Sequence, residues 1–376
     1  MKSENLNSFN TLSNLVGKGK NLVVQSTRMD FDTNTYISEL WKRSNGEWKK
    51  FKSGDSNFSN PKFGDKENTI FYIKTNRTVQ DKSKSKKTLS SIYMQAGRSV
   101  NRVFEIDGSI SNYLLSADGK FIYVTTSEFS EEFKNIENKD SEPMYYENLP
   151  FRFDTRGIIY NKRGHVYKVN LGTSKFNKIV DGDKNHIISI GSLVESDKGV
   201  VFSYEKYNSK GTMLEEKVGS LETKKINEVH SKGSMGNLFY YEGELHAVGL
   251  RNRFDWPTNT AVLKLSSNGK VTYRHRTFDR NVVKAEVNNS VLYFLYEDSG
   301  KTLLRDGTNN IDLIDAEVTV KDFAFNNDKT YVIANSFSKP DEVYELNNGQ
   351  LEKTSKANEF FNKKVKTWDC EYKRID

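Results

Sequence analysis

The stretch SADGKFIYVTT, residues 116–126, joins a polar turn to a run of aromatic and β-branched residues. Asp and Gly favour tight turns, whereas aromatic and β-branched side chains favour strands. The stretch therefore predicts a turn that leads into a strand. The same combination recurs along the chain, for example as FNNDKTYVIANS at residues 325–336 and as VNNSVLYFLYE at residues 287–297.

This combination occurs seven times and indicates a repeated unit. The turn residues that mark the units are Gly17, Asp65, Asp118, Asp197, Gly243, Asn288 and Asn327. Successive markers are 39 to 53 residues apart, except for the 79 residues between Asp118 and Asp197. Each unit contains four strand-like runs, and no stretch has a sustained helical period. We therefore predict an all-β fold, a seven-bladed β-propeller of four-stranded antiparallel blades, in a single domain at residues 1–354.

The two terminal units each supply four strand-like runs of their own. We therefore predict an open topology, in which blade 1 and blade 7 close the propeller by packing face to face. In this arrangement neither end of the chain donates a strand to the blade at the other end.

The long third unit carries an insertion at about residues 128–164. Its end reads ENLPFRFDTRGIIYNKRGHVYKVNL at residues 147–171 and is rich in charge. In one interpretation Arg152, Asp154 and Arg156 form a rim that faces a substrate or partner, since the arginine donor fork suits carbonyl and carboxylate groups. In the other, Phe151 and Phe153 pack between blades while Arg152 and Asp154 pair with their neighbours.

A second candidate for recognition is RNRFDWPTNT at residues 251–260, because Arg and Trp favour recognition surfaces. It supplies Arg251, Arg253 and Trp256 as candidates that face a substrate or partner. The alternative is a loop in which Trp256 packs on its own blade.

Other features indicate which partners and groups are not expected. The lysine-rich run DKSKSKK at residues 81–87 lacks interleaved aromatic residues and arginines, so we expect a solvated hairpin tip and no nucleic-acid partner. The five histidines are dispersed without metal-ligand spacing. We therefore predict no metal site and no cofactor, although a metal-dependent propeller enzyme remains an alternative, since blades can gather residues at a central channel.

The composition suits many short strands joined by polar loops. Hydrophobic residues make up 35% of the 376 residues, with 23 Phe, 19 Tyr and a mean hydropathy of -0.72. The single cysteine, Cys370, excludes a disulfide within the chain. No run approaches the ~20 apolar residues of a membrane span, and the first residues lack the apolar core of a signal peptide. We expect no membrane association and a cytoplasmic location.

Two segments resemble the propeller domain of acylaminoacyl peptidases and related serine peptidases of the prolyl oligopeptidase family. The first is YYENLPFRFDTRGIIYNKRGHVYKVNL, residues 145–171, followed by KIVDGD at residues 178–183. The second is VIANSFSKPDEVYELNNGQLEKTSKANEFF, residues 332–361, which is similar to the last blade of that group. The resemblance implies a propeller that packs against an α/β-hydrolase domain and restricts entry to short peptides.

The sequence departs from that family where the catalytic serine is concerned. The hydrolase places its serine in a G-x-S-x-G turn between a strand and a helix. The nearest match, KGSMG around Ser234, has a lysine at the first position and continues as a strand-like run. We therefore predict no catalytic residue and no enzyme activity in this chain, with residues 355–376 as a tail or linker toward a hydrolase domain that the chain lacks.

The resemblance thus implies a non-catalytic propeller that gates and helps to recognise peptides for a serine peptidase. Its expected partners are peptides or a serine peptidase α/β-hydrolase domain. The alternative is a stand-alone propeller that serves as a scaffold for protein interactions, because fold alone does not determine function.

Overall fold

The computed structural model describes residues 3–76, 88–134, 143, 145–154, 156–222, 225–252, 258–266, 270–274 and 278–368. The lysine-rich run at residues 81–87 lies outside these residues, as do Arg253 and Trp256. No helix in the described part of the chain is long and apolar enough to cross a membrane.

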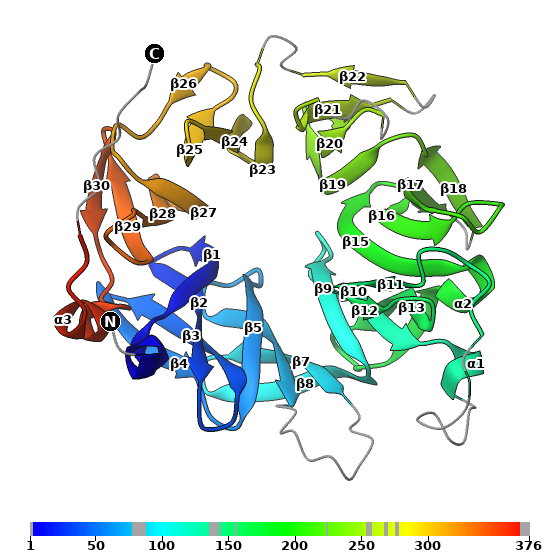
Figure 1. The fold of residues 1–376 in the computed structure, drawn as a ribbon, viewed down its shortest axis with the longest axis horizontal. Helices are drawn as coiled ribbons and strands as arrows, with labels where there is room; N and C mark the ends of the chain where they lie inside the picture. Colours follow the sequence, from blue (N-terminus) through cyan, green and yellow to red (C-terminus); the bar gives the residue numbers. More distant parts are fainter. Residues whose placement is uncertain are drawn as a thin grey trace. The chain divides into compact units, whose positions relative to one another are not determined.

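Seven four-stranded antiparallel sheets form the blades of a β-propeller, which confirms the predicted fold (Figure 1). Blade 1 consists of β1 (Thr11–Lys18), β2 (Asn21–Asp30), β3 (Thr35–Ser44) and β4 (Glu47–Lys52), and blade 2 of β5 (Ser56–Phe63), β6 (Thr69–Asn76), β7 (Leu89–Ala96) and β8 (Ser99–Asp107). Blade 3 consists of β9 (Ser109–Leu115), β10 (Phe121–Phe129), β13 (Lys162–Asn170) and β14 (Phe176–Val180). Blade 4 consists of β15 (Ile187–Ser196), β16 (Gly199–Tyr207), β17 (Leu214–Glu222) and β18 (Lys225–His230). Blade 5 consists of β19 (Ser234–Tyr241), β20 (Glu244–Leu250), β21 (Ala261–Leu265) and β22 (Val271–Tyr273), and blade 6 of β23 (Val282–Asn288), β24 (Val291–Asp298), β25 (Lys301–Asp306) and β26 (Ile311–Asp312). Blade 7 consists of β27 (Thr319–Asn326), β28 (Lys329–Asn335), β29 (Glu342–Asn347) and β30 (Gln350–Lys353).

The remaining elements are short. The described residues contain a 3-10 helix η1 (Ser3–Ser8) and the helices α1 (Glu131–Lys134), α2 (Gly182–Asn185) and α3 (Glu359–Lys364). A two-stranded hairpin of β11 (Arg152–Phe153) and β12 (Gly157–Ile158) lies within the insertion of blade 3, between β10 and β13.

The chain forms two compact units, Met1–Arg102 with Tyr293–Asp376, and Val103–Leu292. Blades 1 and 7 belong to the first unit, and blades 3, 4 and 5 belong to the second. Within blades the second strand is the most deeply buried element; residues 122–126 of β10 are all buried. A strand that is buried on both faces reads as a continuous apolar run, as the repeats do.

Asn-Gly pairs form the turns of two of the hairpins. Asn45 and Gly46 join β3 to β4 with φ values of 51° and 88°, and Asn348 and Gly349 join β29 to β30 with φ values of 47° and 81°. Two successive positive φ values are typical of a type I′ turn, whose twist matches that of the flanking strands. These turns fix the register of the outer strands in blades 1 and 7.

Blades 1 and 7 each form a complete sheet from their own strands and pack against each other. Leu12, Leu15 and Val24 of blade 1 share one buried cluster with Ile333 and Val343 of blade 7. This confirms the predicted open topology, because among the described residues no strand from one terminus completes the blade at the other.

Buried polar side chains add hydrogen bonds to this apolar contact. Asp341 Oδ2 accepts the backbone N–H of Leu12 at 2.8 Å. Asn358 Oδ1 accepts the N–H of Asn10 at 2.7 Å, and Asn358 Nδ2 donates to the carbonyl oxygens of Asn10 and Asp341 at 2.9 and 2.8 Å. Glu342 Oε1 accepts the N–H of Asn358 at 3.1 Å. We call Asp341, Glu342 and Asn358 the terminal clamp.

The innermost strands of neighbouring blades are also joined by single side chains. Asp322 Oδ2 on β27 accepts the N–H of Leu15 on β1 at 2.9 Å. In the second unit, Ser192 Oγ on β15 accepts from Leu238 on β19 at 2.8 Å. Asn237 Oδ1 on β19 in turn accepts from Ala285 on β23 at 2.5 Å. Leu15 and Leu238 lie where the register of their ladders shifts, so these bonds satisfy N–H groups that would otherwise remain unpaired.

Replacing Asn358 by alanine tests the terminal clamp. We expect Asn358→Ala to lower the free energy of unfolding by about 2–3 kcal/mol, because it leaves buried backbone groups of Asn10 and Asp341 without partners. Urea denaturation followed by circular dichroism measures the change. The matched control is Asn362→Ala on the exposed side of α3, for which we expect a change within about 0.5 kcal/mol. Equal effects of the two substitutions would contradict the role of the clamp.

Candidate functional site

The candidate site is the end of the blade 3 insertion, in the second unit. β11 and β12 pair antiparallel, with Arg152 opposite Ile158 and Phe153 opposite Gly157. Gly157 has a φ of 65°, a left-handed conformation that glycine adopts without strain. The hairpin is closed further by the N–H of Ile159, which donates to the carbonyl of Phe151 at 2.9 Å.

Blade 4 holds the insertion in place. The Arg156 guanidinium makes a bidentate ion pair with Glu205 on β16, with Nη1–Oε1 and Nη2–Oε2 distances of 3.2 and 2.7 Å. The Ser189 hydroxyl donates a short hydrogen bond to the same carboxylate. Next to this pair, the Tyr207 hydroxyl donates to the carbonyl of Pro150 at 2.8 Å, and the N–H of Leu149 donates to the carbonyl of Gly211 at 2.7 Å.

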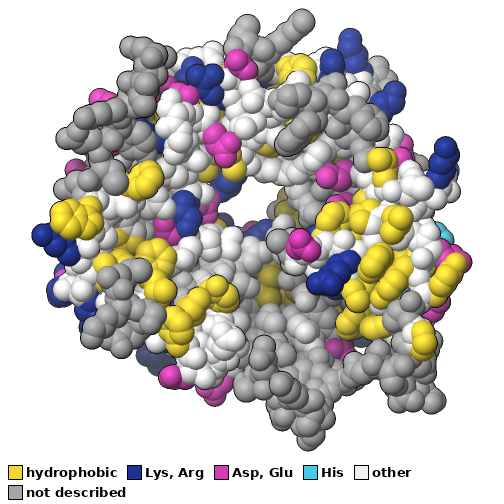
Figure 2. Space-filling model, viewed as in Figure 1, with side chains coloured by type: hydrophobic (Ala, Val, Ile, Leu, Met, Phe, Trp, Pro, Cys, Tyr) yellow, Lys and Arg dark blue, Asp and Glu magenta, His cyan; other side chains and the backbone are white. Residues whose placement is uncertain are grey.

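The outer side of the insertion combines apolar and charged groups. Figure 2 shows hydrophobic side chains gathered on the right of the face drawn, where blade 3 carries its insertion. Between residues 145 and 158, the exposed large apolar side chains that the structure describes are Tyr145 (81% exposed), Leu149 (59%), Ile158 (42%) and Phe153 (39%). Arg152 and Asp154 are exposed beside them on the hairpin. We call these six residues the insertion surface.

The side chains of the insertion divide into those that pack or pair and those that face outward. Phe151 packs inward by stacking on Tyr146, with ring centroids 4.6 Å apart, and Arg156 is paired. Arg152, Phe153 and Asp154 face outward. Arg152 and Asp154 are therefore exposed on the hairpin, whereas Arg156 ties the hairpin to Glu205 of blade 4. Whether Arg152 and Asp154 face a substrate or partner stays a prediction.

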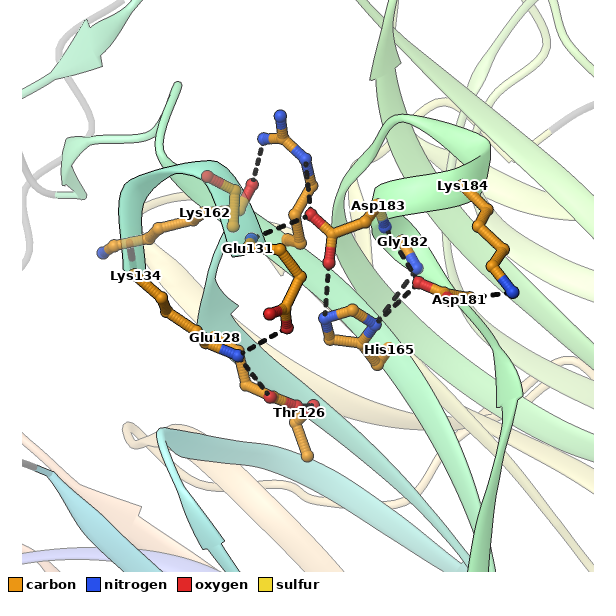
Figure 3. A network of polar contacts seen from close by, with 12 residues as sticks. Thr126, Glu128, Glu131, Lys134, Lys162, His165, Asp181, Gly182, Asp183 and Lys184 are labelled. Carbon is orange, nitrogen blue, oxygen red and sulfur yellow. Dashed lines mark hydrogen bonds and ion pairs between the residues drawn. The ribbon is translucent and has the colours of Figure 1, made fainter. Parts of the chain in front are cut away.

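A buried polar network lies where the insertion returns to blade 3 (Figure 3). His165 on β13 is fully buried, and its Nδ1 accepts the N–H of Gly182 at 3.1 Å. Asp181 Oδ1 lies 3.7 Å from Nδ1, and Asp183 Oδ2 lies 3.9 Å from Nε2, on the other side of the ring. Asp183 also faces Arg163, with an Nε–Oδ1 distance of 3.6 Å.

Glycine permits this close approach of β13 and α2. A Cβ atom on Gly182 would lie 2.3 Å from the carbonyl oxygen of Gly164, closer than real contacts allow. A Cβ atom on Gly164 would in turn lie 2.9 Å from the backbone nitrogen of Ile190 on the next blade. The two glycines thus let blade 3 and blade 4 approach next to the histidine.

The hydrogen bond from Gly182 to His165 argues against a metal ion on this ring. One atom each of His165, Asp181 and Asp183 lies within 4.8 Å of the others, which is the spacing of a possible cation site. However, an N–H group donates to Nδ1, so the ring proton lies on Nε2 and neither nitrogen offers a lone pair to a metal.

Burial controls the protonation of His165. Burial is the largest effect and lowers the pKa of the imidazole. The Glu128 carboxylate raises this pKa by a smaller amount, and the Lys178 ammonium lowers it. Glu128 is itself buried and accepts hydrogen bonds from Thr126 at 2.8 Å and Tyr167 at 2.9 Å. The network is therefore built around a neutral histidine.

The other residues singled out in the sequence have separate positions. Arg251 is exposed after β20, with its guanidinium 5.5 Å from the ring centre of Tyr273. Arg253 and Trp256 lie outside the described residues, so their predicted role stays a prediction. Ser234 lies in β19 and donates to Glu216 Oε2 at 2.7 Å, which is not the geometry of a nucleophile elbow.

Sequence reasoning did not assign Glu205 or Asp183 a role. Asp183 belongs to the KIVDGD segment that contributed to the family resemblance, so a signal for it was present. Glu205 lies 49 residues after Arg156, inside an ordinary strand pattern, and nothing local marks it as the partner.

The fold and this site define a seven-bladed propeller with an open topology and an anchored insertion in blade 3. Among solved structures, an acylaminoacyl peptidase in complex with Z-Gly-Gly-Phe-chloromethyl ketone is similar over 98% of this chain and 57% of its own, with a TM-score of 0.74 and 15% identity. For the acylaminoacyl peptidase of Pyrococcus horikoshii in its orthorhombic crystal form, the coverage is 98% and 56%, the TM-score 0.74 and the identity 14%.

A solved propeller domain is similar along almost its whole length. The β-propeller domain of the Trilobed protease from Pyrococcus furiosus, described as having an open velcro topology, is matched over 93% of this chain and 99% of its own. The TM-score is 0.63 and the identity 12%. No family model and no curated protein matches the sequence. At these identities the likeness establishes the fold, and the chain corresponds to the propeller portion of the peptidases, about 57% of their length.

The lowered pKa of His165 predicts a pH dependence of stability. The folded-state pKa is below the value of about 6.5 in the unfolded chain, so the unfolded state binds more protons between these two values. The free energy of unfolding then falls as the pH decreases through this range. His165→Asn keeps an acceptor for Gly182 and does not titrate. We expect the stability difference between wild type and His165→Asn to shrink from about pH 8 to about pH 5, measured by urea denaturation. A constant difference would contradict the assignment.

The ion pair between Arg156 and Glu205 predicts local stability of the insertion. We expect Arg156→Lys, which keeps the charge but loses the bidentate geometry, to speed amide exchange at Ile159 and Tyr160 by roughly three- to tenfold. Hydrogen exchange read by mass spectrometry measures this. Arg152→Lys on the same hairpin is the matched control and should leave the exchange unchanged. An effect as large in the control would refute the anchoring role of Arg156.

Proposed function

We propose that the chain is the substrate-selecting propeller of a serine peptidase of the acylaminoacyl-peptidase type, acting with an α/β-hydrolase domain that supplies the catalytic groups. The observation that carries the proposal is the likeness of nearly the whole chain to the propeller portion of such peptidases. Propellers of this type pack against α/β-hydrolase domains. In the proposal, peptidase activity belongs to the propeller and the hydrolase domain together.

The insertion surface supports a role in recognition. Exposed aromatic and apolar groups beside charged ones are the composition of protein and peptide interfaces, where Tyr and Arg are enriched. The anchoring by Arg156 and Glu205 reduces the conformational entropy that the hairpin would lose on binding. In the proposal Arg152 offers its donor fork to a peptide carbonyl or carboxylate, and Asp154 offers a negative charge to a basic group.

The positions of Ser234 and His165 support the proposal that catalysis belongs to the partner. Ser234 is engaged with Glu216 in a strand, and His165 is buried in its own network, so neither can act as a nucleophile or a general base. We propose that the propeller contributes selection and the partner contributes catalysis. A cytoplasmic location, expected from the sequence, is part of the proposal.

Affinity purification from the native source, combined with a fluorophosphonate probe for active serines, tests the function. We expect the probe to label a co-purifying α/β-hydrolase and not the propeller. We expect the double variant Arg152→Glu, Phe153→Ser to capture less hydrolase, because it removes a positive charge and an apolar group from the insertion surface.

The matched control is Lys225→Glu on β18, an exposed charge reversal outside the insertion surface. A partner that no serine probe labels would favour the interaction scaffold instead. Labelling of the propeller itself would refute the division of labour.

A further inference from the structure

A cavity of about 340 Å³ lies in the first unit, between blade 1 and the segment that leaves blade 7. Its walls come from β1 to β4 and from residues 354–357. It is separate from the insertion surface and from the His165 network, which both belong to the second unit. Ligand cavities are typically about 300–1,000 Å³ and mostly apolar, so this one is large enough for one large side chain.

Two indole rings dominate the walls. Trp41 on β3 and Trp48 on β4 line the cavity together with Leu12 and Val24. The Lys50 ammonium lies 5.6 Å from the ring centre of Trp41 and pairs with Glu39 at 3.1 Å, so this cation is already engaged. Aromatic walls favour an aromatic guest, because stacked or edge-to-face pairs add to the gain from burying apolar area.

The polar groups of the lining are largely engaged with one another. Ser26 Oγ donates to Asn10 Oδ1 at 3.2 Å, and Asn10 Nδ2 donates to the carbonyl of Ala357 at 2.8 Å. The Ser355 hydroxyl donates to Glu342. A guest in the interior therefore gains by being apolar, since a buried polar group would find few partners there.

The mouth has the opposite character. Gly46, Glu47 and Lys356 are the exposed residues of the lining. The Glu47 carboxylate belongs to the hairpin between β3 and β4, and the Lys356 ammonium belongs to residues 354–357, the exit segment. Glu47 and Lys49 form an exposed ion pair at 2.8 Å. Charges of both signs beside an apolar interior suit a guest whose apolar part enters while a neutral, strongly dipolar backbone stays at the mouth.

Both sides of the cavity are held in place before any ligand arrives. The Asn45-Gly46 turn fixes the hairpin that carries Glu47 and Trp48. On the opposite side, Glu342 Oε2 accepts the N–H of Ala357 at 2.9 Å and so fixes the exit segment. A preformed site avoids part of the ordering cost of binding.

We propose that this cavity binds an aromatic side chain of a short peptide, with the ring between Trp41 and Trp48 and the peptide backbone at the mouth formed by Glu47 and Lys356. The site does not depend on the proposed function, because it needs neither the insertion surface nor a hydrolase.

Fluorine NMR of the full chain labelled with 5-fluorotryptophan tests the site. The four tryptophans, Trp41, Trp48, Trp256 and Trp368, give separate reporters. We expect acetyl-Gly-Phe-Gly-amide to shift the signals of Trp41 and Trp48 and to leave that of Trp368, which is 78% exposed after α3, unchanged. Acetyl-Gly-Ala-Gly-amide should bind more weakly by on the order of tenfold to a hundredfold, because it buries no ring.

The variant Ala357→Phe fills the cavity from the exit segment and keeps the backbone bonds of residue 357. We expect it to abolish the shift of Trp41 and Trp48 while the thermal midpoint stays at or above that of the wild type. Trp48→Ala should weaken binding without filling the space. The proposal is overturned if the phenylalanine peptide shifts neither signal up to its solubility limit, if the alanine peptide binds equally well, or if Ala357→Phe binds like the wild type.

Discussion

The hydrogen bonds of Asp341 and Asn358 to the first strand are the constraint on which the open topology depends. When blades 1 and 7 each complete their own sheet, strand pairing between backbones cannot link one blade to the other. Side chains must instead satisfy the N–H groups of Asn10 and Leu12. Burying Asp341 and Glu342 would be costly without compensation, and Lys321 and Lys353 supply it with ion pairs at 2.6 and 3.0 Å. The last-blade pattern that resembled a known family contains these two carboxylates, so the motif has a structural explanation in the terminal clamp.

Features set by local chemistry could be predicted from the sequence. The polar turns and the apolar runs that follow them depend on neighbouring residues, so they indicated seven blades of four strands each. The links between blades could not be predicted, because they join residues far apart in the chain. Leu12 and Asp341 are 329 residues apart, and no local pattern indicates which polar side chain reaches which N–H. The cavity lined by Trp41 and Trp48 could not be predicted for the same reason, since its other wall comes from the opposite end of the chain.

The insertion shows why a charged segment is hard to interpret without its surroundings. Arg152 and Arg156 are four residues apart, chemically identical and both exposed, yet only Arg156 forms a bidentate pair with Glu205. The difference is made by β16 of the next blade, which places a carboxylate beside one arginine. A buried neutral histidine next to two carboxylates is a similar case, because the N–H of Gly182 decides which ring nitrogen carries the proton.

The terminal clamp also determines how a mechanical load would travel through the molecule. Asn358 is bonded on one side to Asn10 and on the other to Asp341, before the chain enters α3. A body attached beyond α3 and pulled away would therefore load the Asn358 side chain and, through it, β1 as well as β29. The force is shared between the first and last blades, and the outermost strand β30 is not peeled from its sheet alone. A rigid-body movement of an attached domain would thus reach both sides of the junction between blade 1 and blade 7 at once.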